Sequence, residues 1–277
     1  MSKPIIALMY DFDRTLALED MQNFSLIPKL GYTPEEFWSL TQEFCNKYDM
    51  DKILGYLYMI IKIAKEKNIK LTREEFKSCG KAIKFFDGVT TWFSRMNDYA
   101  ASKGLQCEHY LITSGNKEIV EGTQIFKEFK QIFGCEYLYN DGGEPFWPRT
   151  IVNYTLKTQY IFRISKGVIN TNDDREVNEK TPLRRIIYQN MVYLGDGLTD
   201  VPCMILLKEN GGTSIAVYPK GKLNKVANLL EDDRVNYLCR ADYSANSELE
   251  KVMKLIIDQI SIREALKAKK EKTEKAL

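Results

Sequence analysis

The chain has 277 residues, a length that fits one large domain or two unequal ones. Its formal net charge of +2 is too small to indicate a nucleic-acid partner, and no apolar run approaches the ~20 residues that a membrane helix needs. The N-terminus lacks the basic, apolar and small-residue order of a signal peptide. Six cysteines without a C-x-x-C pair indicate reduced thiols, so we expect a cytoplasmic protein with neither a nucleic-acid nor a membrane partner.

The first predicted element is a buried strand over residues 5–10, a short apolar run that ends in charge. Asp11-Phe-Asp13-Arg-Thr15 follows it directly. Two carboxylates two residues apart can share one site as a nucleophile and a proton donor, which a displacement at phosphorus needs. Asp and Thr also favour turns, so a loop or a helix cap is the structural alternative for this motif.

Residues 17–86 are predicted to be helical. Thr33-Pro34-Glu35-Glu36 is typical of a helix start, residues 51–67 carry apolar side chains at helical spacing, and the segment from Thr72 to Glu75 has the pattern of a capping box. The segment is rich in aromatic side chains, most of which we expect to pack, with a minority available to line a substrate pocket. These aromatic residues include Phe24, Tyr32, Phe37, Trp38, Phe44, Tyr48, Tyr56 and Tyr58.

The next predicted elements are a helix over 88–103, a strand over 109–113, a helix over about 116–130 and a strand that enters a hairpin turn within 136–143. Thr113, Ser114 and Gly115 end the strand at 109–113, where hydroxyls and the amides of a helix N-terminus can bind phosphate oxygens. A helix cap by Ser114 or Asn116 is the structural alternative, and it is compatible with phosphate binding. His109 is the only histidine, so we expect it to be structural, because one histidine cannot build a zinc site.

A helix is predicted over 158–165, and the polar residues 170–184 are predicted to form a surface loop. A second short apolar run, residues 191–194, ends in Gly195-Asp196-Gly197-Leu198-Thr199-Asp200. Carboxylates at the ends of two buried strands can hold Mg²⁺, which prefers oxygen ligands. A capped turn between a strand and a helix is the alternative for this motif.

A helix, a strand over 213–217 and a charged tail from Leu266, predicted to be a frayed helix end, complete the chain. Strands that alternate with helices predict an α/β fold, a doubly wound parallel sheet covered on both faces. Ligands of such sheets bind at the carboxyl ends of the strands, where the three motifs fall.

With these motifs the chain resembles the haloacid dehalogenase (HAD) superfamily of phosphohydrolases, in the phosphoserine-phosphatase-like branch with a helical C1 cap. The resemblance implies a Rossmann-like catalytic core from residues 1–16 and 87–277, with a cap domain over 17–86. The family also requires a lysine between the second and last motifs. Lys157 fits by order and position, and Lys166 is the alternative.

The resemblance implies a mechanism in which Asp11 attacks the phosphoryl group and forms an aspartyl-phosphate. Asp13 protonates the leaving oxygen and then activates water. Thr113 and Lys157 neutralise the phosphoryl oxygens, in a phosphate site that includes Ser114 and Gly115.

The implied cofactor is Mg²⁺. Its implied ligands are the Asp11 carboxylate, the Asp13 backbone carbonyl and the Asp196 side chain, while Asp200 orients the water shell of the metal.

The function predicted is therefore Mg²⁺-dependent hydrolysis of a small phosphorylated metabolite. A phosphomutase or phosphotransferase shares every motif, and a protein that binds phosphate or metal without chemistry is a further alternative. Phosphoserine is not predicted as the substrate, because Arg73 is the one arginine in 17–86 and its helix-start position favours exposure to solvent. The sequence does not indicate an oligomeric state.

Overall fold

The structure, a computed structural model, describes residues 3–170, 172, 174–180 and 184–276. Its described strands are β1 (Ile5–Tyr10), β2 (Gln106–Asn116), β3 (Gln131–Tyr139), β4 (Pro145–Thr150), β5 (Met191–Gly195), β6 (Thr213–Tyr218) and β7 (Tyr237–Arg240). They form one seven-stranded sheet in the order β4-β3-β2-β1-β5-β6-β7. The predicted α/β fold with a doubly wound sheet is confirmed.

The sheet is parallel except at one edge, where β4 pairs antiparallel with β3. The hairpin predicted within 136–143 makes this connection, so the expectation of an all-parallel sheet is corrected at β4. Pro145 and Pro148 lie in this strand, and proline, which lacks an N–H, is tolerated at a sheet edge. In the centre of the sheet Tyr10 pairs in parallel with both Leu111 and Leu194, so the carboxyl ends of β1, β2 and β5 point to the same side of the sheet.

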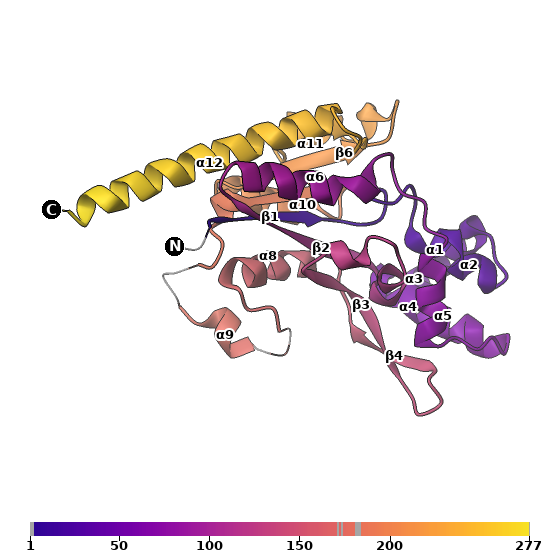
Figure 1. The fold of residues 1–277 in the computed structure, drawn as a ribbon. Coiled ribbons are helices and arrows are strands. Elements are labelled where there is room, and N and C mark those ends of the chain that lie inside the picture. Colours follow the sequence, from indigo (N-terminus) through magenta and orange to yellow (C-terminus); the bar gives the residue numbers. More distant parts are fainter. Residues whose placement is uncertain (1–2, 171, 173, 181–183, 277) are drawn as a thin grey trace.

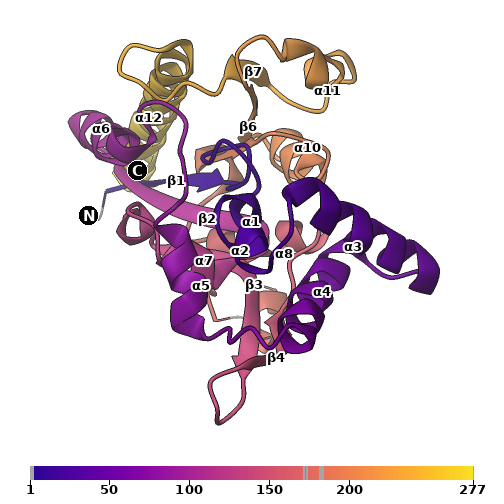
Figure 2. The ribbon, with the colours of Figure 1, turned by 90° about the vertical axis from the view of Figure 1, so that its right-hand side faces the viewer.

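Helices cover both faces of the sheet, as Figure 2 shows. On one face lie α6 (Val89–Ser102) and α12 (Glu248–Glu274), and on the other lie α8 (Leu156–Lys166) and α10 (Val201–Glu209). The remaining helices of this part are α7 (Lys117–Glu121), α9 (Asp174–Asn178) and α11 (Ala227–Glu231), with short 3-10 turns at Phe126–Glu128, Tyr188–Asn190 and Leu223–Lys225. The central strands are apolar and buried on both faces, as expected of parallel strands between two helical layers.

Five helices between β1 and α6 lie beyond the carboxyl end of β1 (Figure 1). They are α1 (Met21–Phe24), α2 (Leu26–Lys29), α3 (Pro34–Tyr48), α4 (Lys52–Glu66) and α5 (Arg73–Gly80). Thr33 forms the predicted capping box of α3 with Glu36. Thr72 caps α5 by accepting from the Glu75 amide, while the Glu75 carboxylate contacts Lys29. The helical character predicted for this segment is therefore observed.

The two connections of this helical segment to the sheet run side by side. Ala17 and Phe85 form an antiparallel bridge, and the Phe86 amide donates to the Leu16 carbonyl at 3.0 Å. A second anchor joins α5 to α7, where Gly80 and Gly122 let the backbones touch. A Cβ at Gly122 would lie 1.7 Å from the Lys77 carbonyl oxygen, so no larger residue fits there.

Three predicted elements differ from the structure. The helix expected over 116–130 ends at Glu121, because the chain turns at Gly122 against the backbone of α5. The polar segment 170–184 contains the short helix α9, and residues 171, 173 and 181–183 of the predicted loop lie outside the described residues. The charged tail continues α12 as a regular helix to Glu274, which projects beyond the sheet (Figure 1).

Arg73 is also placed differently from the expectation. Its side chain is only one-third exposed, and its guanidinium donates to Glu121 at 2.8 Å and to Glu136 at 2.9 Å. Arg73 therefore ties α5 to α7 and β3, and its charge is already neutralised by two carboxylates.

Candidate active site

Asp11 is the first residue after β1, and its backbone amide continues the sheet by donating to the Leu194 carbonyl at 2.9 Å. The chain then turns tightly, with the amides of Leu16 and Ala17 both donating to the Phe12 carbonyl. Arg14 takes a left-handed conformation in this turn, at φ 57°. Because a residue other than glycine rarely adopts such a conformation, the turn is strained at the position that sets the two carboxylates of the motif.

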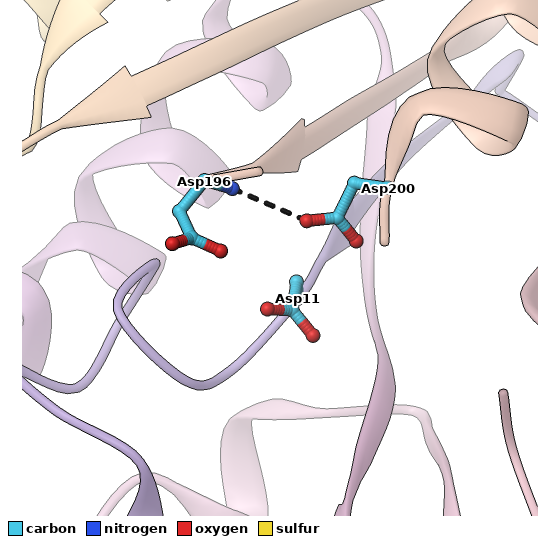
Figure 3. Close-up of side chains that lie close together, drawn as sticks. All are labelled: Asp11, Asp196 and Asp200. Atoms are coloured by element: carbon cyan, nitrogen blue, oxygen red, sulfur yellow. Dashed lines mark hydrogen bonds between the residues drawn. The ribbon is translucent and has the colours of Figure 1, made fainter. Parts of the chain in front are cut away.

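Asp196 and Asp200 follow β5 in a loop that folds back on itself. The Asp196 amide donates to Asp200 Oδ2 at 3.2 Å, and the Tyr193 hydroxyl donates to Asp200 Oδ1 at 2.7 Å. A Cβ at Gly195 would lie 2.4 Å from Asp200 Oδ2, so this fold-back requires glycine. Figure 3 shows that the loop brings both carboxylates beside that of Asp11.

Lys157, on the first turn of α8, is almost completely buried. Its Nζ donates to Asp11 Oδ1 and to Asp200 Oδ1, each at 2.7 Å. Lys166 lies at the other end of the same helix and donates to the carbonyls of Val177 and Glu179. The structure therefore brings Lys157, and not Lys166, to the two acidic motifs.

The charges of this cluster are unbalanced. Burial raises the pKa of Asp11, with Lys157 opposing and Asp200 adding to the shift. Burial and the carboxylates of Asp200 and Asp11 likewise raise the pKa of Asp196. Burial alone would lower the pKa of Lys157, but Asp11 and Asp200 raise it above its ordinary value, so the side chain stays a cation. One ammonium thus faces three carboxylates, and negative charge is left over.

These residues fit a divalent metal ion. Asp11, Asp196 and Asp200 each offer a carboxylate oxygen, and the three oxygens lie within 4.8 Å of one another. Mg²⁺ prefers oxygen ligands, and its two positive charges would compensate the surplus of the cluster.

Asp13 lies beside this cluster, in contact with the start of α1. Its Oδ1 accepts from the Met21 amide at 2.7 Å. Burial, together with the nearby carboxylates of Asp20 and Asp11, raises the pKa of Asp13 well above its ordinary value. This carboxyl group is therefore suited to hold a proton at neutral pH.

The three candidates at the end of β2 are not equivalent. The Thr113 hydroxyl is fully buried and accepts from the Gly115 amide at 3.0 Å. Ser114 lines the cavity that contains Asp11 and Asp13, and its Oγ is buried without a hydrogen-bond partner. Gly115 lies against Asp13, since a Cβ there would come within 3.2 Å of Asp13 Oδ2. Ser114 is thus the one of the three that lines the cavity, although its hydroxyl, like that of Thr113, is buried.

The cavity has a volume of about 630 Å³, within the range of small-molecule sites. Besides the acidic residues and Ser114, its walls include Arg14, Asp20, Trp38, Thr41, Ile53 and Tyr56. The sequence offered little to single these out. Trp38 and Tyr56 were two of eleven aromatic residues in the helical segment 17–86, and Asp20 was one acid of an adjacent pair.

Solved structures share this arrangement of sheet and helices. A HAD-family hydrolase from Salmonella enterica serovar Typhi superimposes with a TM-score of 0.56 at 15% identity, over 85% of this chain and 67% of that chain. A phosphoserine phosphatase with an analogue of its phospho-aspartyl intermediate superimposes with a TM-score of 0.55 at 15% identity, over 91% of this chain and 99% of that chain. This chain has the HAD phosphatase fold. The predicted resemblance to the phosphoserine-phosphatase-like branch is confirmed at the level of the fold.

Sequence comparison alone says less. An uncharacterized protein from Borreliella burgdorferi is 26% identical over 274 residues, which cover 88% of this chain and 94% of that protein. No family profile matches the sequence. Among the described residues of this HAD fold, none of the helices combines the length and the apolar character that crossing a bilayer demands.

Proposed function

We propose that the protein is a Mg²⁺-dependent phosphomonoester hydrolase that acts on a small phosphorylated metabolite. One observation carries the proposal: the buried Asp11 carboxylate, held by Lys157 at 2.7 Å, lies within a 4.8 Å cluster of three acids. Its cavity also contains Asp13 and Ser114. Phosphoryl transfer depends mostly on positioning and on charge stabilisation, and this set of residues supplies both.

In the proposed reaction Asp11 is the nucleophile. Its carboxylate attacks phosphorus, the bond from phosphorus to the leaving oxygen breaks, and an aspartyl-phosphate forms. Asp13, whose pKa burial and neighbouring acids raise, gives its proton to the leaving oxygen. Asp13 then takes a proton from the water that attacks phosphorus, the bond from phosphorus to the Asp11 oxygen breaks, and inorganic phosphate and the free Asp11 carboxylate are released. A phosphoserine phosphatase of the same fold, solved with an analogue of its phospho-aspartyl intermediate, supports this route.

Lys157 and Ser114 are proposed to receive the phosphoryl oxygens. The Lys157 ammonium stays charged between two carboxylates, and the Ser114 hydroxyl has no partner within the described residues. Thr113 is better suited to shape the end of β2, because its hydroxyl accepts from the Gly115 amide. We therefore propose Ser114, which lines the cavity, as the first candidate for the phosphate-binding hydroxyl, with Thr113 as the alternative.

Asp11, Asp196 and the Asp13 carbonyl would hold Mg²⁺, and Asp200 would orient its water. When bound, the ion would neutralise charge on the transferred phosphoryl group. Asp200 is also tied to Lys157 and to the Tyr193 hydroxyl, which suits a positioning role better than direct ligation.

Residues 17–86 are proposed to act as a cap over the core formed by 1–16 and 87–277. The helices α1–α5 lie beyond the carboxyl end of β1, and two of them contribute Trp38 and Tyr56 to the cavity wall. A small phosphorylated metabolite is the proposed partner, and a cytoplasmic location stays a prediction from the cysteine content.

The test is a panel of phosphomonoesters assayed with Mg²⁺ and again with an excess of chelator. We expect phosphate release from at least one ester with Mg²⁺ and none without. Adding glycerol or a sugar as acceptor distinguishes hydrolysis from transfer, because a phosphotransferase would give a new ester in place of inorganic phosphate. Absence of both products across the panel would overturn the proposed function.

A further inference from the structure

The cavity has two parts of different chemistry. Asp11, Asp13 and Asp196 form the part that holds the reacting groups. The helices α3 and α4 supply a second part of the wall, in which apolar side chains lie beside the polar ones of Thr41, Gln42 and Lys52. The apolar side chains are Trp38 and Cys45 from α3 and Ile53 and Tyr56 from α4. This second part is where the leaving group of a phosphate ester would lie.

The two aromatic side chains of this wall offer the cavity no free polar atom, because their polar atoms are already bonded. Trp38 Nε1 donates to Asn23 Oδ1 at 2.9 Å, and the Tyr56 hydroxyl donates to the Ser114 carbonyl at 2.7 Å. Their ring centroids lie 5.9 Å apart at an angle of 69°, which is an edge-to-face contact. The rings are thus fixed in place, and together with Ile53 they form an apolar wall.

The cations around the cavity are mostly engaged. Arg14 pairs with Asp20 at 2.7 Å, and Lys157 pairs with Asp11 and Asp200. Lys52, at the start of α4, is exposed at the rim. Among the described residues that line the cavity, no buried cation is therefore left for the carboxylate of an amino-acid phosphate.

We propose that the cavity accepts the phosphate ester of an alcohol that carries a flat, apolar group, with this group packed against Trp38 and Ile53. The proposal rests on the proposed phosphatase function and specifies its substrate class. Apolar surface removed from water on binding favours such an ester, whereas a serine leaving group would bring two charges beside the apolar side chains of Trp38 and Ile53.

The test compares three esters of primary alcohols, assayed with Mg²⁺: 2-(naphthalen-1-yl)ethyl phosphate, n-propyl phosphate and O-phosphoserine. We expect kcat/KM for the naphthyl ester to exceed that for the propyl ester by about tenfold or more, the gain that even small apolar additions give in a fitted pocket. Trp38→Ala should remove most of this advantage, by lowering kcat/KM for the naphthyl ester several times more than kcat/KM for the propyl ester. Trp147→Ala is the matched control, because Trp147 is 62% exposed on β4 and does not line the cavity.

Ile53→Ala should likewise lower kcat/KM for the naphthyl ester more than for the propyl ester. If circular dichroism shows that Trp38→Ala does not fold, the comparison of Ile53→Ala with the parent chain replaces it as the test. Equal kcat/KM for the naphthyl and propyl esters, or a preference for O-phosphoserine, overturns this proposal and leaves the proposed function standing. A loss of equal size on both alkyl esters in a folded Trp38→Ala protein also overturns it, since this is the result of mere packing. If the parent hydrolyses none of the three esters and none of the wider panel, the proposed function fails and this proposal fails with it.

Discussion

Lys157 Nζ lies 2.7 Å from Asp11 Oδ1 and 2.7 Å from Asp200 Oδ1, so one buried ammonium joins the end of β1 to the loop after β5. The two acids repel each other, and the ammonium between them holds both in place. The position of Asp11 therefore depends on Lys157, whereas the proposed attack on phosphorus depends on the charge of the Asp11 carboxylate itself.

Replacement of Asp11 by asparagine should abolish turnover with the fold intact. Asp11→Asn keeps the shape of the side chain but removes the attacking charge, and Lys157 remains paired with Asp200. We expect phosphate release below about one-thousandth of the parent rate, in the range measured when a catalytic nucleophile is removed. Asp98→Asn, on the exposed face of α6, is the control and should keep full activity. Residual turnover in Asp11→Asn well above this level would mean that another group attacks phosphorus.

Mg²⁺ should raise the thermal stability of the protein. The cluster brings carboxylate oxygens of Asp11, Asp196 and Asp200 within 4.8 Å of one another, and an ion that binds only the folded chain stabilises it by about 2.7 kcal/mol at 100 times its Kd. Differential scanning calorimetry with and without millimolar MgCl₂ should show a Tm higher by several degrees, at roughly 2–4 °C per kcal/mol for a chain of this size.

Asp196→Ala supplies the control for this stabilisation, because it removes one oxygen from the cluster and leaves the Lys157 pairs untouched. The rise in Tm should disappear in this variant. If Asp196→Ala keeps the same rise as the parent, the ion binds at another place on the chain.

The sequence predicted the positions of the acidic motifs well, because each follows an apolar run whose end is marked by charge. Strands buried on both faces have clear boundaries, and the carboxyl ends of neighbouring parallel strands meet at one edge. For the same strands, the sequence does not predict which side chain faces the cavity. Thr113 is buried and Ser114 half-buried, and because both faces of β2 are covered, no alternation of polar and apolar residues indicates which of them lines the site.

Contacts between segments that are distant in the sequence could not be predicted, because they depend on the fold and not on a local pattern. The pattern at Thr72 predicted the start of α5 correctly, because a cap is a local interaction. The partners of Arg73 are Glu121 and Glu136, which the fold brings to it from α7 and β3. Gly122 likewise ends α7 through a contact with the backbone of Lys77 that no local pattern contains.

Ser114 and Thr113 should respond differently to loss of their hydroxyls. Ser114→Ala removes the unpartnered hydroxyl of the cavity, and we expect kcat/KM to fall by about 10²-fold, as for the loss of one preorganised donor, with little change in Tm. Thr113→Val removes the acceptor for the Gly115 amide and should lower stability by about 1 kcal/mol. Urea unfolding and steady-state kinetics on both variants measure the two effects. The opposite pattern, with kcat/KM lost mainly in Thr113→Val, would return the phosphate-binding role to Thr113.

His109, predicted to be structural, should make the protein less stable in mild acid. Its ring is buried between the Tyr10 hydroxyl, 3.0 Å from Nδ1, and Asn97 Oδ1, 3.1 Å from Nε2. Burial lowers the pKa of His109 from its ordinary value of 6.5 to about 4. Between these values the unfolded chain binds a proton that the folded chain does not, so stability falls as the pH drops from 6.5 towards 4 and changes no further below that. By pH 5 the loss is roughly 2 kcal/mol.

His109→Gln isolates this effect, because the chain has one histidine and glutamine keeps a polar group at the position without a charge that titrates. The free energy of unfolding in urea, measured at pH 7.5, 6.5, 5.5 and 5.0, should fall more steeply for the parent than for the variant. Carboxylates also titrate in this range, but both chains share them, so the difference between the two curves reports His109 alone. Parallel curves would show that the pKa of His109 is the same in the folded and the unfolded chain, and that burial does not lower it.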